Sequence, residues 1–122
     1  LILTRSGECI VLEGEKERIR IPKFNLWGLA HTHTRTCIPS PPDIESIEDL
    51  FCNQGIVGVI ISPTCTSAIY RRAPLTEHDI LRLKDLADFL RHSSKEIHSA
   101  NEMVNKIHEL LQGSNIRFKL MY

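Results

Sequence analysis

The stretch that most constrains the fold lies between residues 25 and 62, where a strand, a capped helix and a second strand are predicted in succession. Residues 25–33, "NLWGLAHTH", are apolar enough for an interior strand that ends at two histidines. Ser40 followed by Pro41 is typical of a helix N-cap and a first-turn proline. Residues 56–62, "IVGVIIS", have the β-branched content of a buried strand. This order requires a sheet layer and a helix layer.

Other segments add strands around this unit. The opening "LILTRSGECIVLEG" predicts two short strands around a Ser6-Gly7 turn, or one bent strand. Three further strands are predicted. "ERIRIP" at 17–22 alternates between charged and apolar residues, "SAIYRR" at 67–72 is expected to pair with the strand before it, and "IRFKLMY" at 116–122 is expected to be the last strand.

Two more helices are predicted in the second half of the chain. Thr76 and Asp79 have capping-box spacing, and a stripe of apolar residues follows them. Ser93 or Ser94 is expected to begin the last helix, and Gly113 is expected to end it. Strands, an inserted helix, a hairpin and two helices together predict an α+β fold with a mixed or antiparallel sheet and helices packed on it.

The 122 residues are the length of one domain, with a core over residues 1–75 and a C-terminal helical extension over 76–122. Fifteen basic and fifteen acidic residues cancel, so broad electrostatic binding to nucleic acid or to a membrane is not expected. No apolar run is long enough to span a bilayer, and no signal peptide is evident. We therefore expect a cytoplasmic protein, with an oligomeric state that the sequence leaves open.

The four cysteines, Cys9, Cys37, Cys52 and Cys65, contain no C-x-x-C pair, which rules out a zinc ribbon. Reduced intracellular thiols are the simplest interpretation, with Cys52 in the core. A disulfide is the alternative, because intracellular proteins of hyperthermophiles use them.

His31 and His33 are the residues most suggestive of chemistry. Side chains two apart on a strand point to the same face, so both imidazoles are expected to project together, with Trp27 and Leu29 beneath them in the core. Catalytic zinc sites use three protein ligands and leave one position open, and Asp43 is the candidate third ligand. Ser40-x-x-Asp43 is also an ordinary capping pattern, and the two roles are compatible.

The segment "HTHTRTCIPSPPD" resembles the zinc motif of JAMM (MPN-type) metalloproteases: His-x-His, a loop, then Ser-x-x-Asp. The similarity continues through the helix, "VGVIISP" and "SAIYR", over roughly residues 8 to 72. The resemblance implies a cytidine-deaminase-like MPN architecture and a zinc isopeptidase. Its implied substrate is a conjugate of a ubiquitin-like protein, or else another peptide or amide. It implies His31, His33 and Asp43 as zinc ligands and Ser40 as a donor to the oxyanion.

The family also uses an upstream glutamate as general base, and "GECIVLEG" points to Glu8, with Glu13 second and a residue preceding Leu1 as the third alternative. The chain departs from the family pattern in having Thr34 after the second histidine and a loop one residue shorter. Two alternatives remain: a non-catalytic MPN-type scaffold, and a PHP-type metal phosphoesterase. The latter family has Thr-Asp-His where this chain has Ser-Pro-Thr at 62–64.

Overall fold

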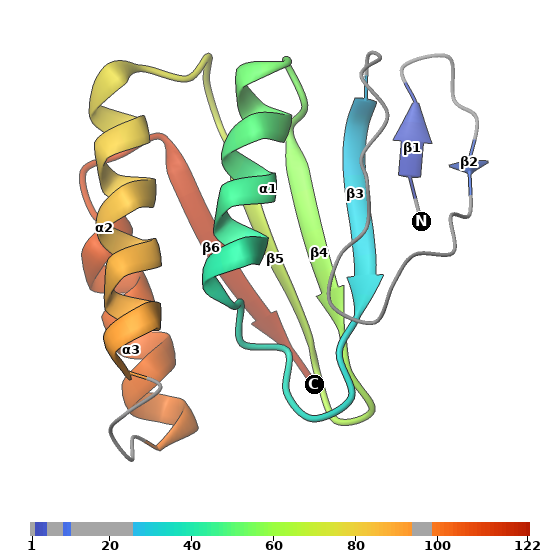
Figure 1. Ribbon diagram of the computed structural model, residues 1–122, viewed down its shortest axis with the longest axis vertical. Coiled ribbons are helices and arrows are strands. Elements are labelled where there is room, and N and C mark those ends of the chain that lie inside the picture. The colour runs from blue at the N-terminus through green and yellow to red at the C-terminus, as the bar shows by residue number, and fades with distance from the viewer. Residues whose placement is uncertain (1, 5–8, 11–25, 94–98) are drawn as a thin grey trace.

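The computed structural model describes residues 2–4, 9–10, 26–93 and 99–122, and its strands form one mixed sheet in the order β2-β1-β3-β4-β5-β6 (Figure 1). Pairing is antiparallel except between β3 and β4, which are parallel and joined through α1. The strands are β1 (Ile2–Thr4), β2 (Cys9–Ile10), β3 (Leu26–Thr32), β4 (Val57–Ile61), β5 (Thr66–Arg71) and β6 (Ile116–Met121).

The three helices are α1 (Pro41–Cys52), α2 (Glu77–Ser93) and α3 (Ala100–Leu111). In Figure 1, α1 and α2 lie in front of the sheet. Contacts run from α1 to β3, β4 and α2, then from α2 to α3, and from α3 to β6. A parallel pair requires a crossover, and α1 therefore runs back against β3. Its N-terminus lies at the end of the sheet where β3 terminates.

One apolar core fills the space between the helices and the sheet. Its residues include Ile44 and Ile47 of α1, Leu83 and Leu86 of α2, and Ile69 of β5, all almost fully buried. Such burial contributes roughly 1.5 to 3 kcal/mol for each large aliphatic side chain. This packing fixes α1, and hence its first turn, relative to the strands.

The structure confirms the α+β class and a mixed sheet, and the opening segment forms two short antiparallel strands. The strand predicted at 17–22 lies outside the described residues. The last helix begins later than predicted: α2 continues to Ser93, and Ser99 caps α3 by accepting a hydrogen bond from the Glu102 backbone N–H. None of the described helices combines the length and apolar character needed to cross a bilayer.

The structure contradicts the sequence interpretation of three cysteines: Cys37, Cys52 and Cys65. Cys37 and Cys65 form a disulfide rather than reduced thiols, with their Cα atoms 5.8 Å apart. Cys52 is free and exposed rather than buried in the core, because it lies in the last turn of α1 on the side away from the sheet. The disulfide ties the loop after β3 to the turn between β4 and β5.

Gly58 permits close contact between α1 and β4. A Cβ at this position would lie 2.8 Å from Cγ1 and 3.0 Å from Cδ1 of Ile47. We therefore expect Gly58→Ala to lower the free energy of unfolding by about 1 to 3 kcal/mol through overpacking. Urea denaturation measures this loss. In an Ile47→Ala background the same substitution should cost less, and an equal cost in both backgrounds would contradict the steric explanation.

Candidate metal centre

His31 and His33 stand where β3 ends. His31 is opposite Ile60 in the parallel ladder, and the backbone N–H of His33 donates to the Ile61 carbonyl at 2.8 Å. Both imidazoles are on the same side of the strand, as the alternation predicts. Their Nε2 atoms are 3.1 Å apart, and each side chain is about a fifth exposed, at 20% and 23%.

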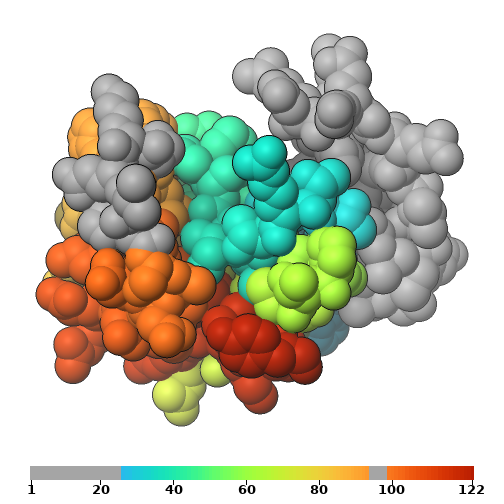
Figure 2. Space-filling model, turned by 90° about the horizontal axis from the view of Figure 1, so that it is seen from below, coloured from blue at the N-terminus to red at the C-terminus, as the bar shows by residue number. Residues whose placement is uncertain are grey.

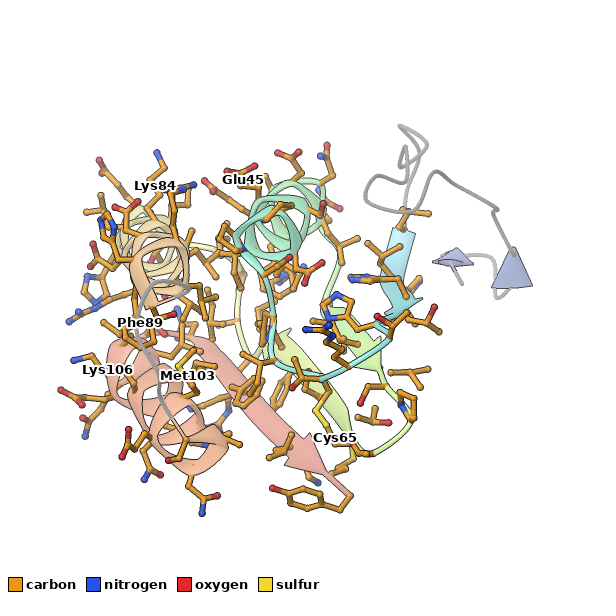
Figure 3. The ribbon with its side chains drawn as sticks, turned by 60° about the horizontal axis from the view of Figure 1, so that its bottom comes forward. Glu45, Cys65, Lys84, Phe89, Met103 and Lys106 are labelled. Atoms are coloured by element: carbon orange, nitrogen blue, oxygen red, sulfur yellow. A yellow bond between two sulfur atoms is a disulfide. The ribbon has the colours of Figure 1, made fainter. Side chains whose placement is uncertain are left out.

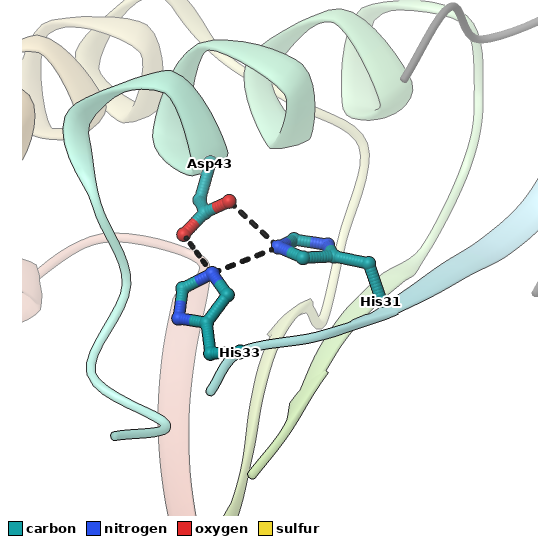
Figure 4. A group of neighbouring side chains, drawn as sticks. All are labelled: His31, His33 and Asp43. Carbon is teal, nitrogen blue, oxygen red and sulfur yellow. Dashed lines mark hydrogen bonds and ion pairs between the residues drawn. The ribbon is translucent and has the colours of Figure 1, made fainter. Parts of the chain in front are cut away.

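Asp43 comes to the histidines from the first turn of α1 (Figure 4). Its Oδ1 lies 2.7 Å from Nε2 of His31, and its Oδ2 lies 3.1 Å from Nε2 of His33. The structure thus brings together the three predicted ligands, and their ligand atoms all lie within 4.8 Å of one another.

Ser40 determines the direction of this carboxylate. The Ser40 backbone N–H donates to Oδ2 of Asp43 at 2.7 Å, and the Ser40 hydroxyl accepts from the Asp43 backbone N–H at 3.4 Å. This is a complete capping box. Since Oδ2 also faces His33, the cap and the candidate ligand are the same group, and the cap preorganises the ligand.

The pKa of Asp43 reflects this arrangement. Burial on its own raises the pKa of the carboxyl, but the hydrogen bond with His31 and that from the Ser40 backbone more than offset it. The result is a pKa below the ordinary value of 3.8, so the carboxylate is ionised at neutral pH. An anionic ligand therefore faces the two imidazoles.

The tautomer of His33 follows from its other nitrogen. Nδ1 lies 3.1 Å from the Thr36 carbonyl, which can only accept, so the hydrogen of the neutral ring is assigned to Nδ1. The Nε2 lone pair of His33 is then directed toward His31 and Asp43. A metal-binding histidine usually donates its second N–H in this way, and the partner fixes the ring.

These distances suit a small divalent metal. Two nitrogens bonded to tetrahedral zinc at about 2.0 to 2.1 Å stand roughly 3.3 Å apart. The two Nε2 atoms here are 3.1 Å apart, and two imidazoles with one carboxylate are a common catalytic zinc set. When no metal is bound, the 2.7 Å contact between Nε2 of His31 and the carboxylate of Asp43 needs a hydrogen on that nitrogen, and a bound metal ion would take the place of this hydrogen.

No family model, curated protein or solved structure matches this chain. The JAMM resemblance therefore stays a prediction from the motif, and the metal role depends on the geometry above. Glu8 and Glu13, the two candidates for general base, lie outside the described residues.

The motif did not indicate three supporting groups: the Thr36 carbonyl, the Cys37–Cys65 disulfide and Ser67. The Ser67 hydroxyl is buried and donates to the Cys37 carbonyl at 2.6 Å. The position of Cys37 within the loop was the one available signal, but a separation of 28 residues gives no indication of pairing. A backbone carbonyl and a strand serine have no sequence signature.

Proposed function

We propose that this protein is a zinc-dependent metalloprotease of the JAMM type, which cleaves the isopeptide bond joining a ubiquitin-like protein to its conjugate. The observation that carries the proposal is the convergence of His31, His33 and Asp43 from two elements at a partly exposed end of the sheet. Nε2 of each histidine and the carboxylate of Asp43 would hold the ion. Zinc there would supply Lewis acidity, which polarises an amide carbonyl and acidifies water.

Ser40 is proposed to stabilise the oxyanion. Its hydroxyl oxygen accepts from the Asp43 backbone N–H, and a serine hydroxyl can donate its own hydrogen while it accepts. A hydroxyl beside the ligand set can donate to the substrate carbonyl oxygen as negative charge develops. Glu8, or else Glu13, is proposed to accept the proton of the attacking water and to return it to the leaving amine.

Hydrolysis of a ubiquitin-like conjugate by the zinc-loaded chain tests this function. We expect cleavage that a chelator stops and added zinc restores, and that Glu8→Gln or Glu13→Gln abolishes. Zinc binding without cleavage of any such conjugate would favour the scaffold. Hydrolysis of a phosphate ester in place of the amide would favour a PHP-type phosphoesterase.

Ser40→Ala is expected to lower kcat by about 100-fold, the usual loss for one oxyanion donor. The backbone N–H that orients Asp43 remains, so zinc affinity should change little. Ser99→Ala is the matched control, because the Ser99 hydroxyl likewise accepts from the backbone N–H three residues on, that of Glu102. Both variants should lose about 1 kcal/mol of stability, which is typical of an N-cap. Equal kcat in the two variants would assign Ser40 to capping alone.

A further inference from the structure

Cys37 anchors the loop that joins the histidines at the end of β3 to Asp43 in α1. This residue is fully buried and is bonded to Cys65 in the turn after β4 (Figure 3). Its carbonyl accepts the hydrogen bond from Ser67 of β5. In Figure 2 the loop, in cyan, lies against the β4–β5 turn, in yellow-green. One covalent bond and one buried hydrogen bond therefore hold the same residue, and both come from the β4–β5 hairpin.

Cys37 is connected to the His33 ring through a single peptide group. The Thr36 carbonyl, which accepts from Nδ1 of His33, belongs to the planar peptide that joins Thr36 to Cys37. Fixing Cys37 therefore limits where this carbonyl can point. The backbone of His33 is held by Ile61, at the start of the same hairpin turn. The hairpin thus holds both the main chain and the ring of one candidate ligand.

We propose that the Cys37–Cys65 disulfide and Ser67 position His33 for metal binding, so that reducing the disulfide weakens metal binding at the His31–His33–Asp43 centre. This inference depends on the metal centre of the proposed function, but not on its substrate. Loss of a group that orients a metal ligand typically lowers metal affinity 10- to 100-fold. The disulfide would then make metal loading depend on the redox state of the surroundings.

A phosphine can reduce the Cys37–Cys65 disulfide, with water supplying the oxygen of the phosphine oxide and the two thiol hydrogens. Cys65 is only partly buried, whereas Cys37 is fully buried, so attack is expected at the Cys65 sulfur. Phosphorus bonds to that sulfur, the S–S bond breaks, and Cys37 leaves as a thiolate. Water then displaces the Cys65 thiol and forms the phosphine oxide. Phosphorus is oxidised by two electrons, and the disulfide becomes two thiols.

The test is titration of the full chain with Zn²⁺ alone, in competition with a chromophoric chelator. The oxidised chain is compared with phosphine-treated protein, desalted under nitrogen, and with the Cys37→Ser/Cys65→Ser double variant. The phosphine-treated protein and the double variant should each bind Zn²⁺ 10- to 100-fold more weakly than the oxidised chain does. Ser67→Ala, which keeps the disulfide, should lose affinity severalfold. Circular dichroism at the titration temperature verifies that each form is folded.

Ser114→Ala separates positioning from general destabilisation. Ser114 is also buried, and its hydroxyl donates to the Leu111 carbonyl at the same 2.6 Å as the bond from Ser67. It lies in the turn between α3 and β6, outside the metal centre. Its removal should lower the melting temperature as Ser67→Ala does, but leave zinc affinity unchanged.

Equal or tighter zinc binding by the reduced chain and the double variant would overturn the inference. If only the reduced chain keeps its affinity, a freed thiolate is acting as a ligand and appears as sulfur-to-metal charge-transfer absorption with Co²⁺, and the weaker binding of the double variant still supports the inference. Absence of zinc binding in the oxidised chain would overturn both this inference and the proposed function. Redox-dependent zinc binding without hydrolysis of any conjugate would support the inference while contradicting the proposed activity.

Discussion

His33→Ala is expected to lower zinc affinity by more than about 100-fold and to abolish hydrolysis. The substitution removes a ligand itself, whereas losing only the partner of a ligand already costs 10- to 100-fold. Asp43 keeps its hydrogen bond from Ser40, and His33 is partly exposed, so the fold should remain intact. Zinc titration and metal analysis of the purified protein measure the effect.

His92→Ala is the matched control for this prediction. His92 is an exposed histidine near the end of α2 and is not a member of the candidate metal group. The His92→Ala variant should therefore bind zinc as tightly as the unmodified chain does. If His33→Ala also binds zinc as tightly, the ion is held elsewhere, and the proposed hydrolase loses its centre. Anomalous scattering from a zinc-soaked crystal would then locate the true ligands.

Asp79→Ala is expected to lower the free energy of unfolding by about 2 to 4 kcal/mol, because a hydrogen bond to a charged group contributes about 1.5 to 3 kcal/mol and the donors left behind lose their acceptor. Asp79 is 1% exposed and accepts three hydrogen bonds. The Thr76 backbone donates to Oδ2 at 2.9 Å, and Asn115 donates from its backbone at 2.9 Å and its side chain at 3.1 Å. Removal leaves these donors unpaired and separates the start of α2 from β6.

The contribution of Asp79 to the free energy of unfolding should depend on pH. Burial raises the pKa of this carboxyl, but the hydrogen bonds from Asn115 and Thr76 outweigh it and hold the pKa below 3.8. The native pKa is therefore lower than the unfolded pKa, and the stabilisation is present above the unfolded pKa. It is lost as pH falls through the native pKa.

Urea denaturation at pH 7 and at several pH values below 4 measures both predictions for Asp79. The difference between the unmodified chain and Asp79→Ala should be largest at pH 7 and should shrink as the pH falls. Asp85→Ala, on the exposed side of the same helix, is the control and should change stability by less than about 0.5 kcal/mol. A pH-independent difference would mean that the charge of Asp79 contributes nothing.

Local sequence rules were sufficient for much of the fold. Ser40 and Thr76 begin their helices as the capping pattern predicts, because a cap is satisfied by hydrogen bonds three residues away. The last strand was also predicted, and it pairs with β5. Alternation also placed His31 and His33 on one face, because the period of a strand is two.

The same parity rule was wrong for Trp27, which is 43% exposed, although Leu29 two residues later is buried. Parity states which face a side chain is on, but not how much of that face is covered. The start of the last helix was also wrong, since Ser93 still belongs to α2. Competing serines cannot be separated by local pattern alone.

The sequence by itself determined the ligand types, their shared face and the capped turn that carries Asp43. Only the tertiary structure decided that Asp43 lies within hydrogen-bonding distance of both histidines, because this depends on the crossover of α1 and its packing on the sheet. The pairing of Cys37 with Cys65 was decided in the same way. Each of these contacts joins segments distant along the chain, and the packing of the core, not a local pattern, brings such segments together.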